Sequence, residues 1–181
     1  MNIKVVILPG RYGKPHHNWF PYVQRKLAAL DIEVVNIEFP TPTANRARTW
    51  LNFIETLGTD ENTILIGHSS GAVAALRYAE THRILGSILV AACQSHLGDE
   101  EVKASGYFDT LWDWKAIKTN QQWIVQYAST DDPHIPISEA HIIRNALGST
   151  YYEYDDQGHF GKTAGKIKFP EIIQEIKKRI L

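Results

Sequence analysis

The stretch Thr63–His82, TILIGHSSGAVAALRYAETH, decides the fold of this chain. It begins with a short run of apolar and β-branched residues, passes through the string GHSSG, and continues into an alanine-rich segment. A short buried run followed by a longer helical run is typical of a strand that leads directly into a helix. Glycines at Gly67 and Gly71 allow the two elements to approach closely at the turn. We therefore predict a tight strand–turn–helix unit centred on Ser69.

The same alternation of short apolar runs and longer helical stretches extends over the rest of the chain. The runs predicted as strands are Ile3–Leu8, Glu33–Ile37, Thr63–Ile66, Ile84–Ala91, Trp123–Tyr127 and Thr150–Tyr154. The stretches predicted as amphipathic helices are Trp19–Leu30, Thr43–Leu57, Ala72–His82, Leu111–Thr119, Ser138–Leu147 and Pro170–Ile180. Such alternation implies βαβ units and a mostly parallel sheet with helices on both faces. The expected fold class is α/β, a three-layer sandwich with about six strands in one domain spanning residues 1–181.

Composition and charge limit the partners and the location that we expect. The 181 residues suffice for one core and are too few for two comfortable domains. A net charge of -1 provides no electrostatic attraction to nucleic acid or to an anionic membrane. The single cysteine, Cys93, fits a reducing compartment, and its apolar neighbours predict a small core residue. No apolar run reaches the length of a membrane span, so we expect a cytoplasmic protein.

The string Gly67-His68-Ser69-Ser70-Gly71 matches the pattern G-x-S-x-G, which forms the nucleophile elbow of α/β-hydrolases. In such an elbow a sharp turn exposes the serine hydroxyl, and the N-terminus of the following helix favours developing negative charge. The pattern therefore predicts Ser69 as a nucleophile and the amide of Ser70 as one oxyanion donor. The structural alternative is that Ser69 or Ser70 merely caps the helix.

A serine nucleophile needs a histidine base, and that histidine needs an acid to orient it. In α/β-hydrolases the acid and then the base follow the serine in the sequence, each after a late strand. His159 comes directly after the last predicted strand, so it is the predicted base. Two aspartates follow the fifth strand. The pattern D-x-x-I-P at residues 132–136 favours Asp132, and Asp131 is the alternative, whose other role would be to form the turn.

Two further segments are expected to border the site. The loop LPGRYG at residues 8–13 offers the amide of Arg11 or Tyr12 as a second oxyanion donor, although its glycines would equally suit a plain turn. The aromatic segment Gln94–Trp114 is expected either to wall a substrate pocket or to pack on the sheet. The residues predicted to line the pocket are His17, His68, Tyr107, Phe108 and Trp112. Because HExxH, cysteine-rich and phosphate-binding glycine motifs are missing, we predict neither a metal nor a cofactor.

The chain resembles the retinoblastoma-binding protein 9 family of compact α/β-hydrolases over nearly its whole length. The strings that carry the resemblance are GHSSGA at 67–72, RYAETHR at 77–83, LGDE at 97–100, ASGYF at 104–108, STDDP at 129–133 and GHF at 158–160. The resemblance implies a serine hydrolase whose triad consists of Ser69, Asp132 and His159. This choice agrees with the one made from chain order and the D-x-x-I-P pattern.

Two departures from the family bear on function. The family is named for a contact with the retinoblastoma protein through an L-x-C-x-E string. The corresponding string here is Leu57–Glu61, LGTDE, in which Thr59 replaces the cysteine with a hydroxyl that needs a hydrogen-bond partner. We therefore do not expect that contact. The GRYG loop is also poorer in glycine than its counterpart, which leaves its oxyanion geometry open.

The sequence thus predicts hydrolysis of small carboxylic esters through an acyl-enzyme, with amides and short peptides as alternative substrates. The rival hypothesis is a protein-interaction module that keeps the hydrolase fold with little or no turnover. An intact triad in the correct order favours the enzyme. A peroxidase or lyase on the same scaffold has no supporting residue in the sequence.

Overall fold

The computed structural model describes residues 3–42, 44–161 and 165–180. In these residues one six-stranded sheet has the order β2-β1-β3-β4-β5-β6, and every neighbouring pair of strands is parallel. The strands are β1 Lys4–Leu8, β2 Glu33–Val35, β3 Thr63–His68, β4 Gly86–Val90, β5 Trp123–Ser129 and β6 Thr150–Tyr154. The prediction of an α/β fold around a parallel sheet is confirmed.

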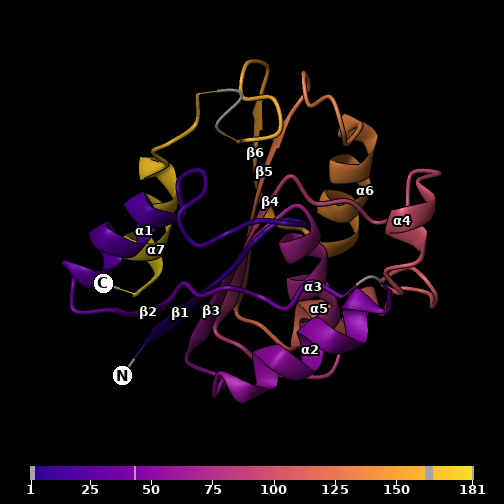
Figure 1. Cartoon of the computed structure of the whole chain (residues 1–181). Helices are drawn as coiled ribbons and strands as arrows, with labels where there is room; N and C mark the ends of the chain where they lie inside the picture. Colours follow the sequence, from indigo (N-terminus) through magenta and orange to yellow (C-terminus); the bar gives the residue numbers. More distant parts are fainter. Residues whose placement is uncertain (1–2, 43, 162–164, 181) are drawn as a thin grey trace.

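Helices cover both faces of the sheet, which gives three layers (Figure 1). The helices are α1 Phe20–Ala28, α2 Arg46–Thr56, α3 Ser70–Ala79, α4 Glu100–Lys103, α5 Trp114–Thr119, α6 Ile137–Leu147 and α7 Pro170–Ile180. The connection from β1 to β2 runs in one direction along the sheet and the later connections run in the other. Because such crossovers are right-handed, α1 lies on the face opposite α2, α3, α5 and α6. Helix α7 packs beside α1 (Figure 1).

The central strands and α3 make up most of the core. Strands β3 and β4 are buried along their whole length, as expected for strands covered on both faces. Helix α3 is buried from Gly71 to Ala79, and its alanines let it lie close to the sheet. The element that carries the predicted nucleophile therefore stands on the most tightly packed part of the molecule. No helix in the described ranges is long and apolar enough to cross a membrane.

Capping aspartates account for two differences from the predicted helices. Helix α5 begins at Trp114 and not at Leu111, because the Asp113 carboxylate accepts a hydrogen bond from the Ala116 amide at 2.9 Å. The short helix α4 was not predicted. Asp99 caps it by accepting from the amides of Glu101 and Val102 at 2.8 and 2.9 Å. Both helices are too short for a periodic pattern to define their ends.

Smaller differences concern element ends. Strand β2 stops at Val35 and not at Ile37, and β4 begins at Gly86 and not at Ile84. Helix α2 begins at Arg46; Thr43, where its start was predicted, lies outside the described residues. The layers and the order of the elements are unaffected by these shifts.

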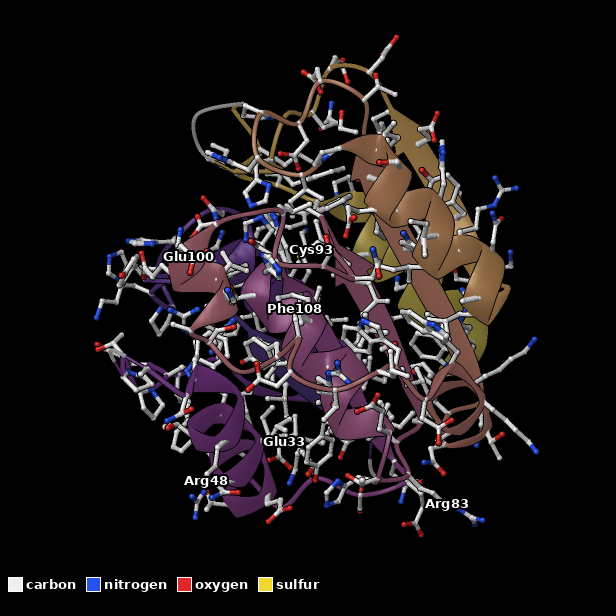
Figure 2. The ribbon with its side chains drawn as sticks, turned by 90° about the vertical axis from the view of Figure 1, so that its right-hand side faces the viewer. Glu33, Arg48, Arg83, Cys93, Glu100 and Phe108 are labelled. Carbon is white, nitrogen blue, oxygen red and sulfur yellow. The ribbon has the colours of Figure 1, made fainter. Side chains whose placement is uncertain are left out.

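The parallel arrangement gathers the carboxyl ends of all strands at one end of the molecule. Figure 2 shows Glu33 and Arg83, which start or precede strands, in the lower part of the molecule, and Cys93, which follows β4, well above them. The loops after β1, β3, β5 and β6 therefore converge, and they contain the predicted oxyanion donors, nucleophile, acid and base. In open α/β sheets this is the end at which ligands bind.

Candidate active site

Ser69 occupies a strained turn between β3 and α3. Its backbone dihedrals are φ 54 and ψ -118, a combination that L-residues rarely adopt. Its amide donates to the Val90 carbonyl at 2.9 Å, and its carbonyl accepts from the Ala72 amide at 2.9 Å. Within the described residues the Ser69 side chain makes no capping hydrogen bond to α3. The geometry therefore lends no support to the capping alternative, and it matches a nucleophile elbow.

The two glycines of the elbow are required by close approach of the backbone. A Cβ at Gly67 would lie 2.5 Å from the backbone of Ala72, on the first turns of α3. A Cβ at Gly71 would lie 2.1 Å from the carbonyl oxygen of Leu8, at the end of β1. Neither neighbour is a movable side-chain tip. The pattern G-x-S-x-G is thus a packing requirement as well as a chemical one.

The predicted acid and base are in direct contact. The Nδ1 atom of His159 lies 2.8 Å from Oδ2 of Asp132, whose side chain is only 3% exposed. The other oxygen of Asp132 accepts from the amides of His134 and Ile135 at 2.8 and 3.1 Å. Because the carboxylate oxygen accepts, Nδ1 of His159 carries the proton, and Nε2 is left with a lone pair.

Asp131 has a different environment from Asp132. Its Oδ1 accepts from the Ser129 hydroxyl at 2.5 Å and from the Gly158 amide at 2.8 Å. The hydrogen bond from Ser129 is the main cause that lowers the pKa of Asp131 below its ordinary value. Asp131 therefore supports the turn that carries His159 and does not contact the imidazole ring. This matches the turn-forming role considered for it and favours Asp132 as the acid.

The loop after β1 lies against the nucleophile. A Cβ at Gly10 would stand 3.4 Å from Cβ of Ser69, a van der Waals contact distance, so this part of the loop packs directly against the nucleophile turn. Gly13 donates to the Gly10 carbonyl at 2.8 Å, and Tyr12 adopts a left-handed φ of 62. The amides of Arg11 and Tyr12 donate to no oxygen among the described residues, and so both remain available as the second oxyanion donor.

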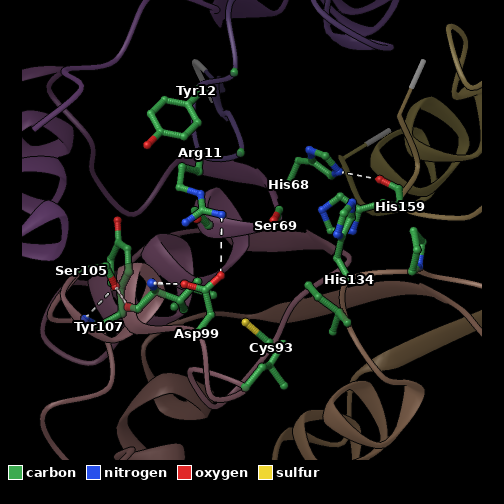
Figure 3. A pocket seen from close by; sticks show the side chains of 18 of the residues that line it. Arg11, Tyr12, His68, Ser69, Cys93, Asp99, Ser105, Tyr107, His134 and His159 are labelled. Carbon is green, nitrogen blue, oxygen red and sulfur yellow. Dashed lines mark hydrogen bonds and ion pairs between the residues drawn. The ribbon is translucent and has the colours of Figure 1, made fainter. Parts of the chain in front are cut away.

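A pocket of about 590 Å³ opens above Ser69, which lines it together with His159. Figure 3 shows His68 and His159 to one side of Ser69, with Arg11 and Asp99 to the other. The predicted site residues that line this pocket are Arg11, Tyr12, His17, His68, Ser69, Ser70, Tyr107, Phe108 and His159. Asp132 lies behind His159, as an orienting acid should.

The prediction for Trp112 needs correction, because it is not among the residues that line the pocket. Its indole nitrogen donates to the Gln94 carbonyl at 2.8 Å, and the Arg77 guanidinium lies 3.6 Å from its ring centroid. Trp112 therefore packs on Arg77 of α3, whereas the alternative considered for this segment was packing on the sheet. Cys93 is 7% exposed, as predicted for a core residue, and it also borders the pocket. Burial raises the pKa of its thiol to about 12.

Comparison with known proteins places the chain in a family. A family model described as serine hydrolase matches residues 5–178. The serine hydrolase RBBP9 of Rattus norvegicus is 42% identical over 98% of this chain and 95% of its own length. The chain belongs to the serine hydrolase family. The resemblance seen in the sequence motifs is thereby confirmed.

Solved structures extend the likeness of this serine hydrolase at the level of the fold. The crystal structure of the ydeN gene product from B. subtilis aligns with a TM-score of 0.88, covering 98% of both chains at 24% identity. The esterase EaEST from Exiguobacterium antarcticum aligns with a TM-score of 0.73 and 13% identity, covering 97% of this chain and 92% of its own. At these identities the alignments establish the α/β-hydrolase fold and nothing finer.

Several residues at the pocket of this serine hydrolase were not predicted. His134 borders the pocket with its ring 5.0 Å from that of His159, at 82° to it. Asp99 lines the far side, and Glu101 lies behind it, 2.9 Å from the Arg11 guanidinium. The string LGDE contained the signal for Asp99, but only the folded chain brings this string to the loop after β1. No cluster of three or more potential metal-ligating side chains occurs in the described ranges.

Proposed function

We propose that this serine hydrolase cleaves carboxylic esters through a triad of Ser69, His159 and Asp132. The observation that carries the proposal is the 2.8 Å contact between Nδ1 of His159 and the buried Asp132 carboxylate. This contact fixes the tautomer of His159 that can accept a proton at Nε2, on a ring that shares its pocket with Ser69. A histidine so oriented, next to a serine in a strained elbow, is the arrangement that acyl transfer requires.

The proposed reaction proceeds through an acyl-enzyme. Oγ of Ser69 attacks the substrate carbonyl carbon while Nε2 of His159 accepts the hydroxyl proton. The resulting oxyanion accepts hydrogen bonds from the Ser70 amide and from the amide of Arg11 or Tyr12. His159 then donates its proton to the leaving alcohol, and the acyl group stays on Ser69. Water, activated by the same His159, releases the acid.

The size and lining of the pocket favour small substrates. A volume of about 590 Å³ is in the range of small-molecule sites. Esters are the substrates proposed first, because the chemistry requires only the triad and the oxyanion donors. Amides and short peptides are the second class, since they need the same acylation with a poorer leaving group.

The interaction-module alternative receives no support from the LGTDE string. The Thr59 hydroxyl is hydrogen-bonded to the Tyr78 hydroxyl, and it lies 3.4 Å from the Ile54 carbonyl. This position is thus joined to α2 and α3 within the same chain. We do not extend the retinoblastoma-protein contact of the family to this protein.

The test is steady-state hydrolysis of p-nitrophenyl butyrate by the unmodified chain, by Ser69→Ala and by Ser138→Ala. Ser138 is an exposed serine of α6, so its substitution controls for the loss of a hydroxyl elsewhere. We expect turnover by the unmodified chain and by Ser138→Ala, and a loss of at least about 10³-fold in Ser69→Ala. Equal turnover by all three chains would contradict the proposal.

A further inference from the structure

The turn that carries His159 has an unfavourable backbone conformation. Gly158 has a φ of 47 and Phe160 a φ of 53, and the second of these is costly for a residue with a side chain. Such a turn persists only if surrounding contacts hold it. The position of the His159 ring therefore depends on what its neighbouring peptide groups bind.

These peptide groups are held from several parts of the fold. The Gln157 amide donates to the Ser129 hydroxyl at 3.1 Å, and the Gly158 amide donates to Asp131 at 2.8 Å. The Phe160 carbonyl accepts from the Trp19 indole at 3.1 Å. The carbonyl of His159 itself accepts from Nε2 of His68 at 2.8 Å (Figure 3).

The contact from His68 differs from the others in its origin. Ser129 and Asp131 belong to β5 and the loop after it, so they fix His159 relative to the acid. His68 is the last residue of β3 and directly precedes Ser69. Its side chain is therefore the link between the nucleophile strand and the base turn, across 91 residues of sequence. A rigid link of this kind sets the distance between nucleophile and base.

The surroundings of His68 fix the orientation of its ring and keep the ring neutral. The residue is 5% exposed, and the rings of Trp19 and Phe20 lie 6.2 Å from it. A Cβ at Gly10 would lie 3.3 Å from Nδ1 of His68, so the loop after β1 closes the other side. Burial and then the charge of His159 lower the pKa of His68 to about 3. The neutral ring donates through Nε2, because a carbonyl oxygen can only accept.

We propose that His68 is a positioning residue of the catalytic centre, whose Nε2–H hydrogen bond to the His159 carbonyl fixes the base relative to Ser69. This inference rests on the proposed function in so far as it concerns turnover. A neutral donor suits the position, since a second positive charge 4.9 Å from the His159 ring would oppose its protonation during the reaction. His68 itself exchanges no proton with substrate.

Two variants of similar length separate the hydrogen bond from the packing. His68→Gln keeps a nitrogen donor near the position of Nε2, and His68→Met fills similar space without a donor. We expect kcat for p-nitrophenyl butyrate to fall roughly 10- to 100-fold in His68→Met, because small misplacements of catalytic groups have effects of this size. We expect His68→Gln to retain kcat within about threefold, and KM to change less than about twofold in both.

A purely structural role would give a different result. It would lower the melting temperature of both variants and leave turnover per folded molecule unchanged, so turnover is measured where circular dichroism shows full folding. The proposal is overturned if His68→Met keeps kcat within about twofold, or if His68→Gln loses as much as His68→Met.

A second measurement does not depend on turnover. Backbone amide hydrogen exchange in residues 157–161 reports directly on the base turn. We expect faster exchange there in His68→Met than in His68→Gln or the unmodified chain, with β5 unchanged. Equal exchange in all three chains would overturn the proposal. An unmodified chain that hydrolyses no ester but shows the expected exchange pattern would refute the proposed function and support the positioning contact.

Discussion

The two sides of Ser69 are held together by different kinds of contact (Figure 3). The base side is defined as His68, Asp131, Asp132 and His159. His159 is bonded to His68 and to Asp132 at 2.8 Å, and Asp131 is bonded at 2.8 Å to the amide of Gly158, which precedes His159. Asp132 and His68 are almost inaccessible to solvent. The ion-pair side consists of Arg11, Tyr12, Asp99 and Glu101. Its carboxylates are 47% exposed, and Arg11 pairs with Glu101 at 2.9 Å and with Asp99 at only 3.9 Å.

The two kinds of contact differ in how firmly they hold the side chains around the pocket. Buried hydrogen bonds are strong and short-ranged, and so they suit groups whose separation must stay fixed during the reaction. Exposed ion pairs contribute little stability and are screened by salt, so their side chains can rearrange around different substrates. If the proposed function holds, the base side carries the reacting groups and the ion-pair side contacts the variable part of the substrate.

The largest effect is expected from the acid on the base side. Asp132→Asn should lower kcat about 10³- to 10⁴-fold, because an amide donor facing Nδ1 favours the wrong tautomer of His159. Asp131→Asn is the matched control, since it keeps an acceptor oxygen and does not face the ring; we expect a loss of less than about tenfold. Turnover of p-nitrophenyl butyrate measures both. An equal loss of kcat in the two variants would contradict the assignment of Asp132 as the acid.

The second comparison is between Gly71, in the nucleophile elbow, and Gly98, which directly precedes Asp99 of the ion-pair side. In Gly71→Ala the new Cβ would meet the Leu8 carbonyl at 2.1 Å, and neither backbone can yield. The expected loss in free energy of unfolding exceeds about 4 kcal/mol. Gly98, in the loop before α4, has a φ of 78 with nothing within 4 Å of its Cβ position, so Gly98→Ala should cost about 1 kcal/mol. Urea titration measures the free energy of unfolding of both variants. A similar loss in the two would show that the elbow can accommodate a Cβ at Gly71.

The third prediction concerns acid stability. His68 is neutral in the folded protein down to a pH near its pKa of about 3, while the same group in the unfolded chain binds a proton below about 6.5. The unfolded state thus takes up more protons as the pH falls, and stability declines. Between pH 7 and pH 5 this group alone should account for a loss of about 2 kcal/mol.

His68→Gln, which does not titrate, provides the control for this prediction. Its free energy of unfolding should fall less than that of the unmodified chain over the same interval, by about 2 kcal/mol. Urea titrations at pH 7 and pH 5 measure this difference. Parallel pH dependence in the two chains would show that His68 is not held neutral by burial.

The smallest effect is expected on the ion-pair side. Glu101→Gln weakens the pairing with Arg11 and the hydrogen bond from the Tyr12 hydroxyl, which is 2.5 Å long. Because Tyr12 is 63% exposed and the side chains of Glu101 and Arg11 are 47% and 29% exposed, the free energy of unfolding should change by less than about 1 kcal/mol, and kcat should be retained. We expect a few-fold change in KM that disappears in about 0.5 M NaCl, where the pairing is screened in the unmodified chain too. A loss in free energy of unfolding above about 2 kcal/mol would show that the ion-pair side is held as firmly as the base side.

The sequence allowed prediction of those parts of the molecule that depend on local patterns and chain order. Alternating strands and helices gave the parallel sheet, and G-x-S-x-G gave the position of Ser69 in the elbow. Chain order then selected His159, and the D-x-x-I-P pattern favoured Asp132 over Asp131; Asp132 and His159 lie in contact in the folded chain. Each of these inferences needs only a local motif or chain order, together with the rule that parallel strands end at the same edge.

The remaining features depend on contacts between distant residues. The hydrogen bond from His68 to the His159 carbonyl and the pairing of Arg11 with Glu101 join segments about 90 residues apart. No periodicity encodes such pairs. Trp112 was assigned to the pocket because its segment is aromatic, but stacking of Arg77 on its ring and the bond to the Gln94 carbonyl hold it on α3.

The most direct test of the account is covalent labelling of Ser69 by a fluorophosphonate, followed by intact-protein mass spectrometry. The reagent reacts with serines that an adjacent base has activated, so it reports on the assembled triad without knowledge of the substrate. The account predicts one added phosphonyl group on the unmodified chain, none on Ser69→Ala, and strongly slowed labelling of Asp132→Asn. A folded, unmodified chain that stays unlabelled, or labelling that persists in Ser69→Ala, would contradict it.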